Sequence, residues 1–465
     1  MKKLLLLIAL TVSAIANATV FVDFEKDPLP LIKINFLIPS ARATQSDTEN
    51  LGLKFLSEFY DSGTKSLSRQ QFKDALSSYG ASLSISTGYQ YAEISTTFPL
   101  NNGKVPEGLI TLIKDAWENP RVDKENFNRA QKYLKASHMA LLDRESSLLS
   151  LAIQKIVAIK LFKLFPYSIE SFDKIKLNEI AELHKNFYSR DSDIWVGIIA
   201  PENLKKDLFK VTQNIFPKAG NVKEGILKTQ LKTAYMPEQK EHLKPTFLVI
   251  DKKDLAQIHY GFVSVAHDKT TPKTELTDNF TYHVLAGGGL ESIYGKRIRE
   301  ERGISYVVGG LLSSFYEYPI VSLYANPQRS KQAEAFEVLD KIVSETFTDG
   351  KIISSVQDSL WSGWLLSFRN GERQSGATPE GRLSRRKDIA TGDLSYELYQ
   401  TPIDDWSVKK AVAAKRLGEF AQSSSLVLGA VGDATELNPF IKKYFPTYNL
   451  IQVNYKEVLK NAWLK

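Results

Sequence analysis

The stretch that decides the fold reads LAGGGLESIYGKRIREERGISY and covers residues 285–306. Three adjacent glycines, Gly287, Gly288 and Gly289, precede a segment with the spacing of a helix, and Gly303 follows it. A run rich in β-favouring residues begins directly after that last glycine. Glycine at a helix end, followed by β-branched and aromatic residues, predicts a helix, a turn and a strand in succession.

This unit places an arginine near the end of its helix and a tyrosine seven residues later, across the turn. Arg299 and Tyr306 can both donate hydrogen bonds to a carbonyl or to a developing oxyanion. Taken alone, the pair has an ordinary explanation, in which the arginine pairs with a nearby glutamate and the tyrosine packs on a strand. The three glycines likewise let the backbone approach closely or only satisfy a tight turn.

Length, composition and charge limit the function classes. The chain has 465 residues, enough for two to four domains, and its 43% hydrophobic and 24% charged residues are those of a globular protein. The net charge of +7 falls to +5 when Lys2 and Lys3 are removed with a leader. Basic residues alternate with acidic ones, which argues against nucleic-acid binding. With no cysteine, disulfides, thiolate metal ligands and a cysteine nucleophile are excluded.

Residues 1–18 have the form of a secretory leader. Two lysines precede an apolar stretch of about a dozen residues and the small-x-small sequence Ala16-Asn17-Ala18. The stretch is too short to span a bilayer comfortably, and no cysteine follows it for lipid attachment. We therefore expect a cleaved signal peptide over residues 1–18 and an exported, periplasmic protein.

The pattern of strands and helices occurs twice along the chain. Strand–Gly/Pro–helix endings at residues 193–216 and 425–444 correspond to each other, which indicates an internal duplication into halves of about 220 residues. The sequence predicts an α+β fold with two homologous α/β halves, each a mainly antiparallel sheet covered by helices. Its expected parts are the signal peptide, an N-terminal domain over residues 19–220, a linker over residues 221–245 and a C-terminal domain over residues 246–465.

Within the first half, the residue pattern predicts several individual strands and helices. Residues 20–24 and 31–38 alternate like a pair of strands, and residues 81–87 and 91–98 like a hairpin. Residues 123–165 read as almost continuous helix.

The order of elements resembles the pitrilysin/insulysin-type (inverzincin) zinc peptidases, and within them the short chains similar to mitochondrial processing peptidase subunits. Nearly the whole mature chain shares this resemblance. It rests on Gly63-Thr64, on Gly80-Ala81-Ser82, on Gln257, on residues 287–290 and, most specifically, on residues 299–306. In this family the arginine and tyrosine of the last motif bind substrate, so the resemblance implies that Arg299 and Tyr306 are a substrate-binding pair, with loop contacts from the three glycines.

The family's zinc-binding motif is not matched. Lys54, Ser57 and Glu58 occupy the positions where the family has His, Glu and His, and Ala136 and Ser137 lie around the place of the third ligand. An ammonium group repels Zn²⁺, and without the central glutamate no base activates a metal-bound water. Lys54 and Glu58 are instead spaced to form an ordinary helical ion pair.

The histidines do not replace the missing ligands. None of them is three or four positions from another, so none forms a helical metal clip. We therefore expect no metal and no cofactor in this chain. The six are His138, His184, His242, His259, His267 and His283.

The bacterial chains that this sequence resembles are commonly split between two subunits. The resemblance therefore implies a non-catalytic, substrate-binding subunit that is inactive alone and is part of a zinc-dependent metalloendopeptidase when paired with a zinc-motif-bearing homologue. Arg299 and Tyr306 would act at the partner's zinc site, with a peptide as substrate. The alternative is a catalytically dead peptide-binding or assembly scaffold without an enzymatic partner, which could bind an extended peptide along an edge strand near residues 82–86.

Overall fold

The structure is a computed structural model of the chain, and its described residues exclude some segments. The leader expected over residues 1–18 lies outside them except at Ala18, and so do Gly288, His242 and His267. The described residues are 18–188, 193–216, 221–225, 227–228, 230–231, 243–253, 255–265, 275–287, 289–315, 318–347, 362–366, 376–392, 396, 415–416 and 425–464.

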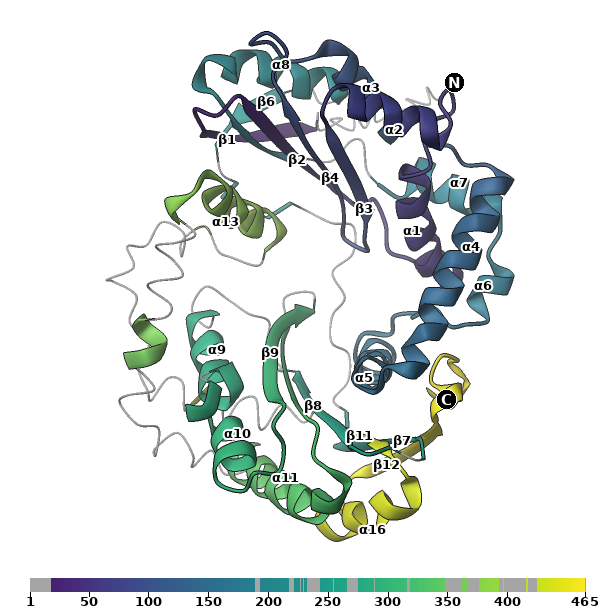
Figure 1. Ribbon diagram of the computed structural model, residues 1–465, viewed down its shortest axis with the longest axis vertical. Coiled ribbons are helices and arrows are strands. Elements are labelled where there is room, and N and C mark those ends of the chain that lie inside the picture. The colour runs from purple at the N-terminus through teal and green to yellow at the C-terminus, as the bar shows by residue number, and fades with distance from the viewer. Residues whose placement is uncertain are drawn as a thin grey trace, which may run out of the picture.

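Two six-stranded mixed sheets, each with helices against it, form the two halves of the molecule (Figure 1). The first sheet has the order β3-β4-β2-β5-β1-β6 and the second the order β12-β7-β11-β8-β10-β9. In the first sheet the strands are β1 (Thr19–Lys26), β2 (Leu31–Pro39), β3 (Ser82–Thr87), β4 (Tyr91–Pro99), β5 (Ile194–Ala200) and β6 (Asn221–Glu224). In the second they are β7 (Thr246–Asp251), β8 (His259–Val265), β9 (Val308–Phe315), β10 (Tyr318–Ala325), β11 (Leu426–Gly432) and β12 (Asn449–Asn454).

Strand direction confirms the duplication and the fold class. In the first sheet β3, β4, β2 and β5 are mutually antiparallel neighbours, and β5, β1 and β6 run parallel. In the second sheet β9, β10, β8 and β11 repeat the antiparallel part, and β11, β7 and β12 repeat the parallel part. The fold is therefore α+β with two homologous halves, each with a mainly antiparallel sheet.

Two details of the expected strands need correction. The strands expected near residues 20–24 and 31–38 are present as β1 and β2 but are not neighbours, because β5 is hydrogen-bonded between them. The strand expected from Ile304 begins at Val308, and before it the Ser305 hydroxyl donates to the Val307 carbonyl and accepts from the Asn326 amide. The hairpin expected over residues 81–87 and 91–98 is confirmed as β3 and β4.

Several helices lie where the sequence pattern predicts them, but the pattern did not predict those over Ser171–Lys174 and Pro379–Thr391. The stretch expected to be continuous helix over residues 123–165 is interrupted at Arg144, whose backbone is extended. The first half contains α1 (Asp47–Tyr60), α2 (Arg69–Ser78), α3 (Glu107–Glu118), α4 (Lys124–Met139), α5 (Glu145–Phe162), α6 (Ser171–Lys174), α7 (Leu177–Asn186) and α8 (Lys205–Ile215). The second contains α9 (Glu275–Tyr282), α10 (Ile293–Gly295), α11 (Gln332–Phe347), α13 (Pro379–Thr391) and α16 (Ala434–Tyr444).

Each half lends one helix to the sheet of the other half. Helix α5 packs on β7, β8 and β11 of the second sheet, in an apolar core that includes Leu149 and Ile153. Helix α13 packs on β1 and β5 of the first sheet, where Leu383 is buried (Figure 1). Equivalent glycines receive the two helices: a Cβ on Gly429 would lie 2.7 Å from Leu149, and one on Gly197 would lie 2.7 Å from Leu383.

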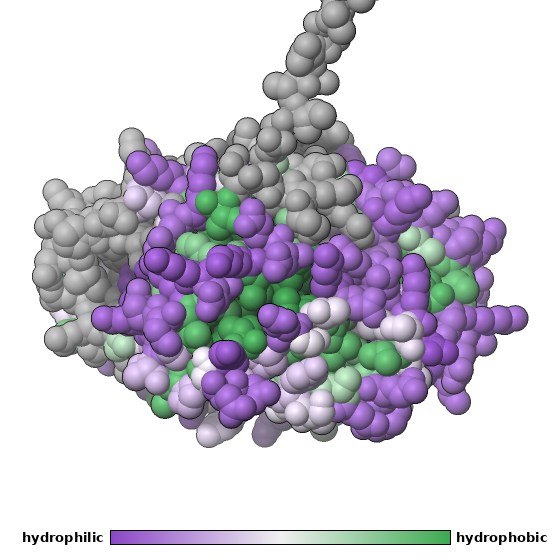
Figure 2. Space-filling view, turned by 90° about the horizontal axis from the view of Figure 1, so that it is seen from above, coloured by the Kyte–Doolittle hydropathy of each residue, from purple (hydrophilic) through white to green (hydrophobic). Residues whose placement is uncertain are grey.

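The remaining helices of the first half cover the outer face of its sheet. Figure 2 shows the molecule from above, on the side of α2, α3 and α8, where hydrophilic side chains predominate around a hydrophobic area. The apolar sides of α1 and α3 face the sheet in one buried core. Among the described residues, no helix combines the length and apolarity that crossing a membrane requires.

The segment expected as a linker over residues 221–245 is described only in part. It begins with β6, the outermost strand of the first sheet, which pairs in parallel with β1. Leu227 and Leu231 then pack with α13 against the first sheet.

Candidate functional site

A short turn between η5 (Lys296–Glu300) and β9 holds the arginine and the tyrosine of the second half. Its two ends are anchored in the core, because Ile298 and Ile304 are fully buried and the amide of Ile304 donates to the carbonyl of Ile298 over 2.8 Å. Gly303 lies between them with a φ of +53°, a left-handed conformation that suits glycine. The side chain of Lys331 donates to the Gly303 carbonyl over 2.9 Å. The glycine stop that the sequence predicts is therefore confirmed.

The turn brings Arg299 and Tyr306 together. The guanidinium carbon of Arg299 lies 4.3 Å from the centre of the Tyr306 ring, the geometry of a cation–π contact. Tyr306 is 79% exposed, so its hydroxyl faces solvent. Within the described part of the chain, Arg299 forms no ion pair with a carboxylate, whereas its neighbours Arg297 and Arg302 pair with Glu345 and Glu337. The ordinary explanation by a glutamate partner therefore does not hold for Arg299.

The glycines before this helix serve the local turn. Gly289 has a φ of +63°, and its carbonyl accepts from the hydroxyl of Ser292 over 2.6 Å. A Cβ on Gly295 would lie 2.1 Å from that same carbonyl, and a Cβ on Gly287 would lie 2.7 Å from the Tyr282 ring. Backbone and ring packing therefore account for Gly287, Gly289 and Gly295, and their role as substrate contacts stays a prediction.

The degenerate zinc-motif positions lie on α1, at the other half of the molecule. Ser57 Oγ is 2.7 Å from Thr87 Oγ1 and accepts from the Thr87 amide over 3.1 Å, so it ties α1 to the end of β3. Glu58 lies 3.7 Å from Arg129 of α4. The expected ion pair between Lys54 and Glu58 is wrong, because Glu58 faces Arg129 and Lys54 is exposed on the cavity side of the helix.

These residues do not fit a zinc ion. An ammonium, a hydroxyl already bonded to threonine and a carboxylate facing a guanidinium offer no set of three free donors. In the described part of the chain, no group of three His, Cys, Asp or Glu side chains is placed to hold a metal. His184 is bonded through Nδ1 to the Tyr60 hydroxyl over 2.9 Å, and His138 is buried between aromatic rings. We therefore derive no step through a metal bound to this chain.

A cavity of about 750 Å³ lies between the two halves. It is lined by Lys54 and Asn50 of α1, by one side of α5, and by residues of β8, β9 and β10. A smaller cavity of about 410 Å³ lies between α1, α2 and β3. Strand β3 lies at one edge of the first sheet, as the scaffold alternative expects.

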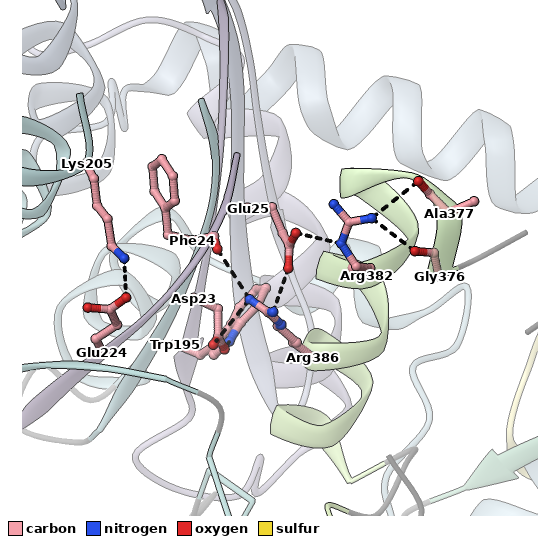
Figure 3. A network of polar contacts seen from close by, with 10 residues as sticks. All are labelled: Asp23, Phe24, Glu25, Trp195, Lys205, Glu224, Gly376, Ala377, Arg382 and Arg386. Carbon is pink, nitrogen blue, oxygen red and sulfur yellow. Dashed lines mark hydrogen bonds and ion pairs between the residues drawn. The ribbon is translucent and has the colours of Figure 1, made fainter. Parts of the chain in front are cut away.

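A cluster of charged residues under α13 was not predicted from the sequence. Asp23 and Glu25 of β1 are almost fully buried on the inner face of the first sheet, and Arg382 and Arg386 reach them from α13 (Figure 3). Trp195 donates to Asp23 over 2.7 Å. Burial raises the pKa of Asp23, against the opposing effects of the Trp195 hydrogen bond and of Arg386. An alternating strand with two acids carries no signal for such a partner, because Arg382 lies 357 positions from Glu25.

Comparison with known proteins agrees with this architecture. Residues 174–354 match the family model of the peptidase M16 inactive domain. The resemblance to these peptidases is confirmed. The matched residues of the M16-like chain run from α6 to beyond α11 and include the turn with Arg299 and Tyr306. No curated protein matches the sequence.

Solved structures share the M16 fold at low sequence identity. The peptidase M16 inactive domain from Pseudomonas fluorescens has a TM-score of 0.71 and 14% identity, with 90% of this chain and 96% of that chain covered. A protease from Helicobacter pylori has a TM-score of 0.68 and 11% identity, with 88% and 96% covered. The periplasmic protease PqqL from Escherichia coli has a TM-score of 0.65 and 12% identity, with 87% of this chain but 43% of that chain covered. The M16-like chain therefore has the size of the first two and about half the length of PqqL.

Proposed function

We propose that this chain is the non-catalytic, substrate-binding subunit of a heterodimeric zinc metallopeptidase. The observation that carries the proposal is the Arg299–Tyr306 pair, stacked at 4.3 Å, with an exposed Tyr306 and no carboxylate partner for Arg299 in the described structure. The buried side chains of Ile298 and Ile304 anchor the segment that carries both residues, which favours positioning their donors before a substrate arrives. The match of residues 174–354 to an inactive peptidase domain supports it.

The proposed chemistry divides between two chains. A homologue with an intact zinc motif would supply the metal, the activated water and the general base. Arg299 and Tyr306 would donate hydrogen bonds to the peptide carbonyl under attack, and these bonds strengthen as negative charge develops on that oxygen. The degenerate α1 helix explains why this chain needs such a partner, because Lys54, Ser57 and Glu58 cannot bind zinc.

We place the complex in the periplasm. The leader-like residues 1–18 support export, and the periplasmic location of PqqL is compatible with it.

A mixing experiment tests the proposal. The mature chain, its zinc-motif homologue and an equimolar mixture are assayed against a quenched peptide pool, with and without a chelator. We expect activity in the mixture alone, lost with the chelator, together with a complex on size-exclusion chromatography. No gain on mixing and no complex would overturn the proposal.

The scaffold alternative has one observation in its favour. Edge strand β3 borders a cavity of about 410 Å³, and Ser82, Ser84 and Ser86 on it are exposed. An extended peptide could add to this edge through backbone hydrogen bonds. If the chain binds peptides, but neither the chain nor its mixture with the homologue cleaves them, the result would favour this alternative.

A further inference from the structure

The cavity between the two halves has an apolar wall and a polar end. Leu149, Ile153 and Val157 lie four positions apart along α5 and form one stripe of its lining. Opposite them, Leu311 and Ser313 of β9 point into the same space. The polar end is formed by α1 and by tyrosine side chains that include Tyr89 and Tyr167.

The described lining carries positive charge and no acidic side chain. Lys54 and Lys155 line it, together with His259. The ammonium of Lys155 already donates to the backbone carbonyls of residues 458–460. Its distance to the Val458 carbonyl oxygen is 3.1 Å. Lys54 is exposed and forms no ion pair with any described carboxylate. An anionic group entering the cavity would therefore find one available cation and no repelling charge.

An unpaired acceptor lies one helical turn before this cation. Asn50 is 2% exposed, and its amide nitrogen donates to the carbonyl of Phe165. That bond fixes the orientation of the amide, and its oxygen, Oδ1, has no hydrogen-bond partner. Asn50 lines the cavity, so an occupant that carries a hydrogen-bond donor could satisfy this acceptor. A peptide backbone supplies such a donor, whereas a fatty acid supplies none.

Strand β9 adds a third element of recognition. It pairs with β10 on one side, and no described strand pairs with its other edge, although the Gly310 carbonyl already accepts from the Tyr282 hydroxyl. Leu311 is 58% exposed on this strand. An extended peptide beside β9 would find backbone hydrogen bonds and an apolar wall together.

We propose that this cavity binds an extended peptide segment with apolar side chains and a carboxylate, which pairs with Lys54 while a peptide N–H donates to Asn50 Oδ1. The proposal rests on the proposed function and names its substrate class as acidic, apolar peptides. The chain thus presents an exposed ammonium where its catalytic relatives are expected to hold zinc, and selects substrate there instead of cleaving it.

The test measures peptide binding by the mature chain alone. Three fluorescein-labelled nonapeptides of Val, Leu and Ser carry Glu, Gln or Lys at the centre, and binding is followed by fluorescence anisotropy. We expect the Glu peptide to bind about tenfold more tightly than the Gln peptide, because a charge-assisted hydrogen bond is lost with the amide. Lys54→Met should abolish this difference, and Lys54→Glu should reverse the preference towards the Lys peptide.

The matched control is Lys132→Glu, which makes the same charge change on α4, away from the cavity lining. It should leave the preference for the Glu peptide intact. Asn50→Leu should weaken the binding of all three peptides to the same extent. Dodecanoate should not displace the peptides from the unsubstituted chain. Equal effects of Lys132→Glu and Lys54→Glu, no difference between the Glu and Gln peptides, or tighter binding of dodecanoate than of peptide would each overturn the inference.

This test fails independently of the proposed function. If the mixture with the homologue is active while the Glu preference is absent, only the substrate class is wrong. If the preference depends on Lys54 while the mixture is inactive, the heterodimeric enzyme is wrong and the peptide site stands.

Discussion

At the scale of single residues, Arg299 differs from Arg297 and Arg302 because it forms no ion pair in the described part of the molecule, and Tyr306 is 79% exposed. Arg299→Ala or Tyr306→Phe should therefore leave the thermal unfolding of the chain unchanged, and should lower kcat/KM of the active mixture by about 10²–10³-fold if each supplies an oxyanion donor. Arg302→Ala is the matched control, since Arg302 pairs with Glu337. A mixture that stays fully active with both variants would contradict the assigned role.

His138 makes stability depend on pH. Burial, assisted by the nearby charge of Lys155, lowers its pKa from 6.5 to about 4. Below pH 6.5 the unfolded chain takes up a proton that the folded chain does not accept until about pH 4. The free energy of unfolding should therefore fall by roughly 3 kcal/mol as pH falls across this range. His138→Phe removes this contribution, and denaturant titrations at pH 7.5, 5.5 and 4.5 would measure the difference. Parallel pH profiles of the two proteins would show that His138 does not titrate this way.

At the scale of elements, the two exchanged helices differ in one kind of contact. Both pack through apolar residues, but α13 also forms the ion pairs of Arg382 and Arg386 with β1 (Figure 3). Arg386→Met leaves the buried charges of Asp23 and Glu25 with one partner fewer, and should destabilise the protein by about 3 kcal/mol in urea unfolding.

The same helix provides the control for this prediction. Lys387 pairs with Glu93 at 2.7 Å, but both side chains are about one-third exposed. Lys387→Met should lower the free energy of unfolding by under about 1 kcal/mol. Equal effects of Arg386→Met and Lys387→Met would mean that burial of the acids does not decide the strength of this contact.

The packing of α13 on the first sheet can also be tested at Gly197, the glycine of β5 that contacts this helix. A Cβ on Gly197 would lie 2.5 Å from the Trp195 ring and 2.7 Å from Leu383. Gly197→Ala should therefore destabilise the protein by about 1–3 kcal/mol. Leu383→Ala in the same chain should recover part of that loss, and a double-mutant cycle measures the coupling. Strictly additive effects would indicate that Leu383 does not press on this strand.

At the scale of the whole molecule, the sequence predicted features that depend on neighbouring residues. It did not predict features that depend on contacts between distant segments. Ser68 forms a capping box with Gln71, and Gly303 ends its helix as expected, because both effects act within a few residues. The fold class and the duplication followed from such signals repeated along the chain. Periodicity could not show that β5 lies between β1 and β2, since strand order depends on contacts between distant segments.

The candidate site was predictable to a similar extent. The residues that carry the family motif, Arg299 and Tyr306, lie seven positions apart across one turn, so the sequence could indicate that they are near each other. Their cation–π contact and the exposure of Tyr306 became known only from the structure. The cavity that joins Lys54 to β9 draws its lining from both halves of the chain. Its position and the unpaired Asn50 oxygen arise from tertiary packing, which no single segment encodes.

The exchange of α5 and α13 also sets an order of events during synthesis. The inner face of the first sheet, with Leu37, Trp195 and Ile199, is covered by Leu383 and Ala390 of α13. A ribosome that has produced the first half has not yet made the residues that close it, so this apolar face stays open until α13 emerges, nearly two hundred residues after β5. Export in the unfolded state, in line with the periplasmic location proposed above, would avoid this interval, because α13 is synthesised before the first sheet folds.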